Sequence, residues 1–387
     1  MIRYLGQEEY GKCLPLWQEA FPEDSQAFLG YYFNKKLPGS RVLVKEDGSG
    51  SILTMAHLNP YTVMVRRRRY RLSYIVGVAT AASSRHQGHM RDVLVKMLQD
   101  MHDSREPFCY LMPASPDIYR PFGFTYVFDQ PLWELGDDGP AGEKVELRLD
   151  GPEAEWLSQW MNRWLDARFQ VYGLRDKAYL DMLQAELDSE DGHVWGWLDS
   201  QGELAALQAF WGIRKQEQRF LYSDREEWLR PAESGRKKDP GIMARITDVT
   251  AMAEPISLNE ECPCPRMEVL VRIHDRLIKE NDGLWRWKLD MDSSSLDRTS
   301  PVHEQESGRP GGSGNCLMST EVLDITVDQL ASWLFGYMPL DGILEEDGTE
   351  PPFWCRYIRP LEGIFLDEIV SVSYTHLDVY KRQDQEW

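Results

Sequence analysis

The chain has 387 residues, of which 42% are apolar, and a formal net charge of −20 at pH 7. This length predicts two or three domains, and no run approaches the roughly 18 apolar residues of a membrane-spanning helix. The negative charge argues against general nucleic-acid binding, which requires basic surface, and favours the attraction of cationic solutes. The charged N-terminus lacks the apolar core of a signal peptide. Six scattered cysteines without zinc or thioredoxin spacing predict a reduced, cytoplasmic protein without a metal site.

The first 80 residues predict two helices followed by a β-meander. The helices are expected up to about residue 22 and over 27–33, and the strands over 41–45, 52–58, 61–67 and 69–78. Four consecutive arginines, 66–69, interrupt the meander. We expect them on a hairpin whose outer face is solvated.

Residues 74–91, YIVGVATAASSRHQGHMR, predict a strand, a polar elbow and the start of a helix. Apolar residues then recur at helical spacing and predict one buried stripe, formed by Met90, Val93, Leu94, Met97, Leu98 and Met101. The elbow carries basic residues where a helix exposes unpaired N–H groups and the positive end of its dipole. Gly88 would let a phosphate approach the backbone, so the elbow suggests a pyrophosphate-bearing cofactor. The dinucleotide and P-loop glycine patterns are absent.

The elbow resembles the acyl-CoA-binding motif of GNAT superfamily N-acetyltransferases, R/Q-x-x-G-x-G/A after a V-x-V-like strand. Arg85, Gly88 and the strand 76–80 match this motif, whereas Met90 stands where most of the superfamily has Gly or Ala. A bulky residue there, followed by Arg91, is typical of the Eis (enhanced intracellular survival) branch. The segment IYRPFGF, residues 118–124, resembles the Y-x-x-F-G-F signature near the end of GNAT domains. The two motifs together are a much more specific signal than either alone.

The resemblance implies a site for acetyl-CoA. Tyr119 aligns with the family's tyrosine general acid, which protonates the leaving thiolate, while Tyr126 is less suited. A backbone N–H near Val78, where the family's strand is kinked, would stabilise the oxyanion. The main chain of Val78, Ala79 and Thr80 would pair with the pantetheine arm. The pyrophosphate would be held by Arg85, His86, Gln87, Gly88, His89, Met90 and Arg91, with a further cofactor contact at Ala114 and Ser115.

The general base is harder to place. In the Eis family the chain's own terminal carboxylate accepts the amine proton. The tail 371–387 fits no pattern and resembles a spurious segment found at the ends of metagenomic sequences, so we expect the native carboxylate at or near Val370. If the tail is native, Glu23 or Asp24 are the candidates. These two acids, with Phe28 of an aromatic cluster, are also the candidates for the acceptor pocket.

The remaining chain predicts two further domains. Helices over 153–169 and 177–187, with strands over 193–198, 204–211 and 219–222, lack a second basic elbow. The resemblance to the Eis family implies that 133–238 is a degenerate GNAT-like scaffold, after a GNAT domain over 1–132. A helix with Thr326 at its N-cap lies in the last region, 239–370, which resembles the sterol-carrier-protein-like α+β domain of Eis proteins.

The resemblance thus implies an α+β protein that transfers an acetyl group from acetyl-CoA directly to a primary amine. The acceptor would be a cationic small molecule, aminoglycoside-like or polyamine-like, or a lysine. The family also implies a closed homo-oligomer, a hexamer. Two alternatives stay open: a carrier of lipids or other hydrophobic ligands with a vestigial GNAT domain, and a CoA-binding scaffold without turnover.

Overall fold

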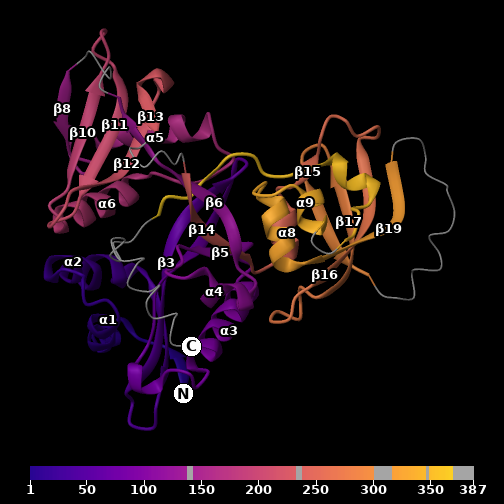
Figure 1. Cartoon of the computed structure of the whole chain (residues 1–387), viewed down its shortest axis with the longest axis horizontal. Helices are drawn as coiled ribbons and strands as arrows, with labels where there is room; N and C mark the ends of the chain where they lie inside the picture. The colour runs from indigo at the N-terminus through magenta and orange to yellow at the C-terminus, as the bar shows by residue number, and fades with distance from the viewer. Residues whose placement is uncertain (137–142, 232–237, 300–315, 346–347, 369–387) are drawn as a thin grey trace.

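The computed structural model describes residues 1–136, 143–231, 238–299, 316–345 and 348–368. Figure 1 shows three units: a central N-terminal unit, a second unit above it at the left, and a C-terminal unit at the right. Val370 and the tail 371–387 lie outside the described residues.

A mixed sheet forms the core of the N-terminal unit, with strand order β1-β2-β3-β4-β5-β14-β6. Its strands are β1 (Ile2–Tyr4), β2 (Arg41–Glu46), β3 (Ile52–Val65), β4 (Arg68–Thr80), β5 (Phe108–Leu111), β6 (Thr125–Pro131) and β14 (Lys238–Ile246). Alternate residues face opposite sides: Val42 and Val44 join the apolar cluster beneath α1 (Leu14–Ala20) and α2 (Gln26–Tyr31), whereas Leu43 joins the cluster beneath α3 (His89–Asp103). The sheet is therefore covered on both faces.

Helix α3 confirms the predicted apolar stripe. It begins directly after Gly88, and the side chains of Val93, Leu94, Met97, Leu98 and Met101 are fully buried, while Met90 is half-buried at the first turn. The stripe packs against β2, β3 and β4, which holds the N-terminus of α3 beside the end of β4.

The second unit is inserted between β6 and β14, which are antiparallel neighbours in the first sheet. The chain leaves and returns through the paired strands β7 (Trp133–Leu135) and β13 (Leu229–Pro231). Its other elements are β8 (Lys144–Leu147), α5 (Ala154–Asp166), α6 (Lys177–Ser189), β10 (His193–Leu198), β11 (Leu204–Trp211) and β12 (Glu217–Ser223). The sequence assigns 239–246 to the third domain, but this segment completes the first sheet, because pairing between distant strands leaves no local signal.

The C-terminal unit is a sheet of order β18-β17-β16-β19 packed with helices. Its elements are α7 (Val249–Ala253), β15 (Ser257–Leu258), β16 (Arg266–His274), β17 (Gly283–Asp290), β18 (Ser294–Arg298), β19 (Cys316–Thr326), α8 (Val327–Leu334), α9 (Leu340–Glu345) and β20 (Ile358–Arg359). Thr326 is the N-cap residue of α8 as predicted, and its backbone N–H donates to the Gln329 side chain over 3.0 Å. The likeness of this unit to a sterol carrier protein stays a prediction.

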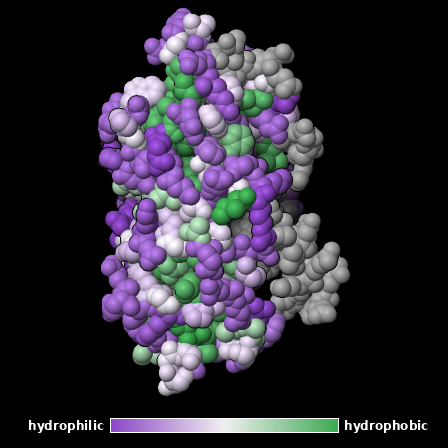
Figure 2. All heavy atoms as spheres, turned by 90° about the vertical axis from the view of Figure 1, so that its left-hand side faces the viewer, coloured by the Kyte–Doolittle hydropathy of each residue, from purple (hydrophilic) through white to green (hydrophobic). Residues whose placement is uncertain are grey.

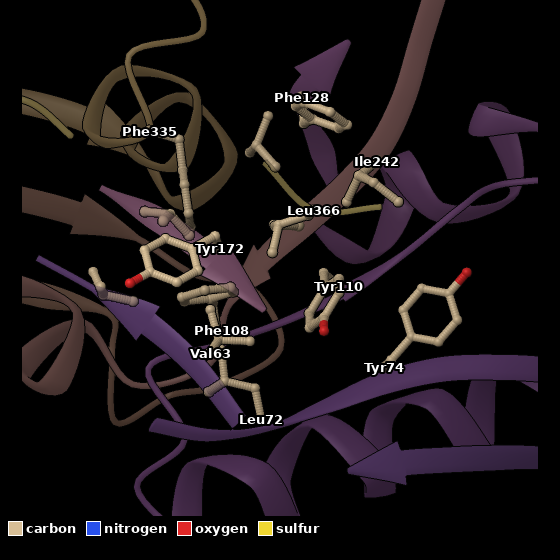
Figure 3. Packing of buried hydrophobic residues seen from close by; sticks show 14 of the residues in the cluster. Val63, Leu72, Tyr74, Phe108, Tyr110, Phe128, Tyr172, Ile242, Phe335 and Leu366 are labelled. Atoms are coloured by element: carbon tan, nitrogen blue, oxygen red, sulfur yellow. The ribbon is translucent and has the colours of Figure 1, made fainter. Parts of the chain in front are cut away.

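Short strands and a shared core hold the units together. Strand β9 (Val171–Gly173) pairs with β3, and β21 (Ile364–Phe365) pairs with β9. Figure 3 shows the resulting packing, in which Tyr172 and Leu366 lie among side chains of the first sheet and Phe335, the residue that follows α8.

The arginine hairpin contributes to this assembly, contrary to the prediction that all of it is solvated. Arg67, Arg68 and Arg69 are exposed, but Arg66 reaches across to the other units. Its guanidinium donates to the Gln170 side chain, to the Ser257 hydroxyl, and to three main-chain carbonyls, those of Pro255, Arg359 and Pro360. All five guanidinium N–H groups are thereby satisfied.

The face that carries the second unit and the first helices is mostly hydrophilic, with apolar side chains in small separate groups (Figure 2). No helix within the described parts of the chain is long and apolar enough to cross a membrane.

Candidate active site

The parallel strands β4 and β5 separate part-way along their length. They meet at Tyr74 and Tyr110, whose ring centroids are 5.3 Å apart. Beyond Tyr74, the described strands show no further β4–β5 pair, whereas β5 pairs along its other edge with β14 over residues 108–111. The last six residues of β4 therefore present a strand edge to which an extended ligand arm can add. Val78, Ala79 and Thr80, predicted to bind pantetheine, lie on this edge.

A β-bulge distorts this edge. Met55 of β3 pairs with Ala79 but His57 pairs with Val76, so Gly77 and Val78 together oppose the single residue between them. Gly77 has a φ of +60°, which is costly for any other residue. The bulge lies next to Val78, where a kinked strand is predicted, and it interrupts the regular register of the β3–β4 ladder. The sequence already held the signal, since a glycine inside a strand pattern often marks a bulge.

The side chain of Trp17 fixes the bulge from the α1 side. A Cβ atom at Gly77 would lie 2.4 Å from the Trp17 ring, so the indole rests directly on the glycine. The indole N–H donates to the Asp24 carboxylate over 2.7 Å. The Trp17 indole therefore lies between the bulge and Asp24, which is one candidate base.

The basic elbow follows β4 as predicted. His86 and Gly88 both have left-handed backbones, with φ of +61° and +76°, and Gly88 is the N-cap of α3 without a side-chain cap. Nothing lies within 4 Å of a Cβ built on Gly88, so the space over the helix N-terminus is open. The side chains of Arg85, Gln87 and Arg91 are exposed around it. Unpaired N–H groups, the helix dipole and two guanidinium groups fit a pyrophosphate.

Two contacts hold the elbow against the strand. The Glu19 carboxylate of α1 accepts the Ala82 N–H over 2.7 Å, and the Arg85 side chain donates to the Thr80 carbonyl over 3.4 Å. The end of β4 and the basic elbow are therefore one connected surface. Of the remaining elbow residues predicted to bind the cofactor, His86 is exposed and His89 is half-buried.

Tyr119 lies on the α3 side of the same opening. It ends the short helix α4 (Pro116–Tyr119) and is 9% exposed, with its ring 5.8 Å from that of Phe124. It belongs to the apolar cluster that contains Ile75 of β4 and Leu111 of β5, and Val78 packs against this cluster. The candidate acid and the bulge therefore border one opening. Ala114, exposed, and Ser115, half-buried, connect β5 to α4 at its rim.

Comparison with known proteins agrees with this geometry. Residues 1–127 match the family described as acetyltransferase (GNAT) domain. The N-terminal unit is a GNAT domain. Its enzyme class is that of an acyltransferase, as the sequence predicts. A search of curated protein sequences finds no significant match.

Solved structures share the fold along nearly the whole chain. A probable N-acyltransferase from Enterococcus faecalis is 15% identical, with a TM-score of 0.73, over 94% of this chain and 99% of that one. A GCN5-related N-acetyltransferase from Anabaena variabilis is 16% identical, with a TM-score of 0.66, over 93% of this chain and 94% of that one. Eis1 from Mycobacterium abscessus is 13% identical, with a TM-score of 0.64, over 95% of this chain and 99% of that one. These likenesses confirm the predicted α+β fold, with its GNAT domain.

A cavity of about 220 Å³ opens on the α1 and α2 side of the GNAT domain, against the second unit. Its lining includes Tyr31, Lys36, Ser40, Tyr61, Arg71, Asp176, Tyr179, Glu186 and Arg219. The ring of Tyr61 lies 6.1 Å from that of Tyr74, where β4 and β5 separate. Through this ring contact the cavity reaches the buried Tyr74, where β4 and β5 separate, on the face opposite α3.

The predicted acceptor residues lie elsewhere. Phe28 is fully buried between Tyr31 and Tyr32, so its ring belongs to the core. Glu23 is exposed and forms an ion pair with Arg214 of the second unit at 3.1 Å. Sequence patterns could not indicate the lining of this cavity, because residues from α6 and β12 meet the N-terminal unit only in the folded chain.

A buried ion cluster lies at the end of the described chain. Arg175 is fully buried, forms an ion pair with Asp367, and donates to Glu368 over 2.8 Å. The other Glu368 oxygen accepts from the Tyr110 hydroxyl at 3.4 Å. Burial raises the pKa of Glu368, and the Arg175 charge opposes that shift. The chain is thus anchored against β5 two residues before Val370.

Proposed function

We propose that the chain is an acetyl-CoA-dependent N-acetyltransferase that acts directly on a primary amine. The observation that carries the proposal is one opening bordered by a phosphate-binding elbow, a bulged strand edge and Tyr119. Acetyl-CoA, when bound, supplies the acetyl thioester.

The residues around the opening would have different roles in the reaction. The N-terminus of α3 with Arg85 and Arg91 would hold the pyrophosphate, and the edge 78–80 would align the pantetheine arm. An N–H at the bulge would donate to the thioester carbonyl oxygen as negative charge develops on it. As the amine nitrogen bonds to the carbonyl carbon and the C–S bond breaks, Tyr119 would donate its hydroxyl proton to the departing sulfur.

The proton lost by the amine needs a base. Asp24 is the better of the two loop acids, because Trp17 holds it beside the bulge while Glu23 is engaged with Arg214. A terminal carboxylate at Val370 remains the other candidate. Chains ending at Val370 and at Trp387 separate the two: a gain in kcat of tenfold or more on truncation favours Val370. Equal rates, with a large loss in Asp24→Asn, favour Asp24.

The decisive test of the acid is Tyr119→Phe. CoA thiol release is followed with a thiol-reactive chromophore and a panel of primary amines. We expect kcat to fall roughly 10²–10⁴-fold with little change in the KM for acetyl-CoA. Tyr126→Phe is the matched control, since that half-buried tyrosine lies on β6 nearby. A loss below about threefold in Tyr119→Phe removes it from this role, and no turnover with any amine argues for the scaffold alternative.

One observation favours a second role as a carrier. A cavity of about 850 Å³ lies in the C-terminal unit, lined in part by Trp333, Met338, Leu340 and Phe353. Its size and apolar lining suit a hydrophobic ligand. Titration with a fluorescent fatty acid checks this role, with Phe353→Ser as the variant expected to weaken binding. An equal affinity in the variant contradicts it.

A further inference from the structure

The cavity beside the opening is locally basic although the whole chain is strongly acidic. Three cationic side chains line it, Lys36 from the turn after α2, Arg71 from β4 and Arg219 from β12. Two carboxylates, Asp176 and Glu186, also line it. The cationic side chains come from both units, so this charge pattern exists only in the folded chain.

Two of the three cations lack an ion-pair partner within the described residues. The Lys36 ammonium donates to the Tyr61 hydroxyl over 2.9 Å and lies 4.2 Å from the centroid of that ring. Arg71 is exposed and forms no ion pair with the described part of the chain. Asp176 is engaged at the N-cap of α6, where its side chain accepts the Tyr179 N–H over 2.8 Å.

A half-buried cation without a carboxylate partner is unfavourable, so an incoming anion would be bound well. Lys36 meets this condition because it is only partly exposed and its hydrogen bond goes to a neutral phenol. The volume of about 220 Å³ is also below the roughly 300–1,000 Å³ of pockets for drug-sized ligands. Both features favour a small ligand with a negative group.

We propose that the acetyl acceptor is a small amine that also carries a carboxylate, which Lys36 and Arg71 bind. This proposal rests on the proposed function, and it selects an amino-acid-like amine over a plain polyamine or an aminoglycoside. The carboxylate at the basic wall would leave the amine to point toward Tyr74 and the opening. The acidic surface elsewhere is compatible with this preference, since a zwitterion with an additional amine is still cationic overall.

The titration of Lys36 supports the geometry. Burial lowers the pKa of Lys36 to about 8, while the nearby charges of Glu186 and Glu368 raise it and that of Arg219 lowers it. The other ionisable or charged groups lining the cavity are Tyr31, Tyr61, Arg71, Asp176 and Tyr179. Binding of a carboxylate should therefore weaken as the pH rises through about 8, because the ammonium loses its charge.

Lysine and cadaverine (1,5-diaminopentane) test the proposal, because they differ by one carboxylate. Wild-type chain, Lys36→Met and Arg71→Gln are compared by CoA release, with Lys35→Met as the matched control at an exposed neighbour. We expect wild type to prefer lysine about tenfold or more in kcat/KM. Lys36→Met should lose that preference, because its kcat/KM for lysine falls to about its value for cadaverine. Arg71→Gln changes an exposed side chain and should leave folding intact. This variant should lose part of the preference for lysine over cadaverine.

Binding without turnover separates this proposal from the proposed function. Lysine and cadaverine are titrated calorimetrically into wild type and Lys36→Met in the absence of acetyl-CoA. Lysine binding that depends on Lys36, without any acetylation, supports the anion site and overturns the proposed acetyl transfer. Acetylation of cadaverine in preference to lysine, or a preference unchanged in Lys36→Met, overturns the carboxylate proposal and leaves the acetyltransferase standing.

Discussion

Replacing Gly77 by alanine should damage both the stability and the rate, because two independent costs meet at this residue. A left-handed backbone, here with φ of +60°, costs a non-glycine residue about 1–2 kcal/mol. The new Cβ would also lie 2.4 Å from the Trp17 ring, and overpacking of this kind costs about 1–3 kcal/mol. We therefore expect a loss of about 2–5 kcal/mol in unfolding free energy for Gly77→Ala.

Gly88→Ala is the matched control. Its φ of +76° carries a similar backbone cost, but nothing lies within 4 Å of the added Cβ. Urea unfolding followed by tryptophan fluorescence should place Gly77→Ala about 1–3 kcal/mol below Gly88→Ala. Equal stabilities of the two variants would refute the claim that Trp17 clamps the bulge. Thiol release should further show a kcat loss of tenfold or more in Gly77→Ala at temperatures where it stays folded, because the N–H at the bulge is displaced.

Three other changes test separate parts of the structure. Gly88→Phe should raise the KM for acetyl-CoA tenfold or more with little effect on kcat, and an unchanged KM moves the phosphate site elsewhere. Burial lowers the pKa of His57 from 6.5 to about 3, so the native state binds fewer protons than the unfolded chain. The neutral His57 therefore contributes at most about 4–5 kcal/mol to the free energy of unfolding. This contribution is fully present above about pH 6.5 and is lost as the pH falls toward 3. His57→Gln should flatten the fall of the urea midpoint between pH 7 and 4, and an identical slope would contradict this account. Arg66→Ala should lower the free energy of unfolding by about 2–4 kcal/mol more than Arg67→Ala, because only Arg66 loses hydrogen bonds to the other units. Arg67 is exposed and has the same left-handed backbone, so it is the matched control. Equal losses in the two variants would contradict the role of Arg66 in holding the units together.

Local sequence patterns were sufficient to predict structure wherever a residue acts through its immediate neighbours in the chain. The stripe of α3, the glycine at its N-cap and the Thr326 cap of α8 follow from spacing and side-chain chemistry, and the structure shows all three. The three tryptophans of α5, spaced four residues apart, do not all pack in the core. Trp160 and Trp164 are buried, but Trp156 is 42% exposed at the start of the helix, where the packing of the second unit ends.

Contacts between distant segments could not be predicted in this way. Arg66 looks like one of four equivalent surface arginines until residues almost 300 positions later close around it. Strand β14 completes a sheet from which the inserted unit separates it in sequence.

By itself, the sequence determined that residues 74–124 form a strand, an anion-binding elbow, a helix and a tyrosine turn, because each depends on short-range spacing and backbone propensity. The tertiary structure alone decided that β4 separates from β5 at Tyr74 and that Trp17 closes on Gly77. It also decided that Lys36 lines a cavity together with groups from the second unit. These features depend on packing between segments far apart in the chain, and side-chain packing and cavity charge exist only once those segments meet.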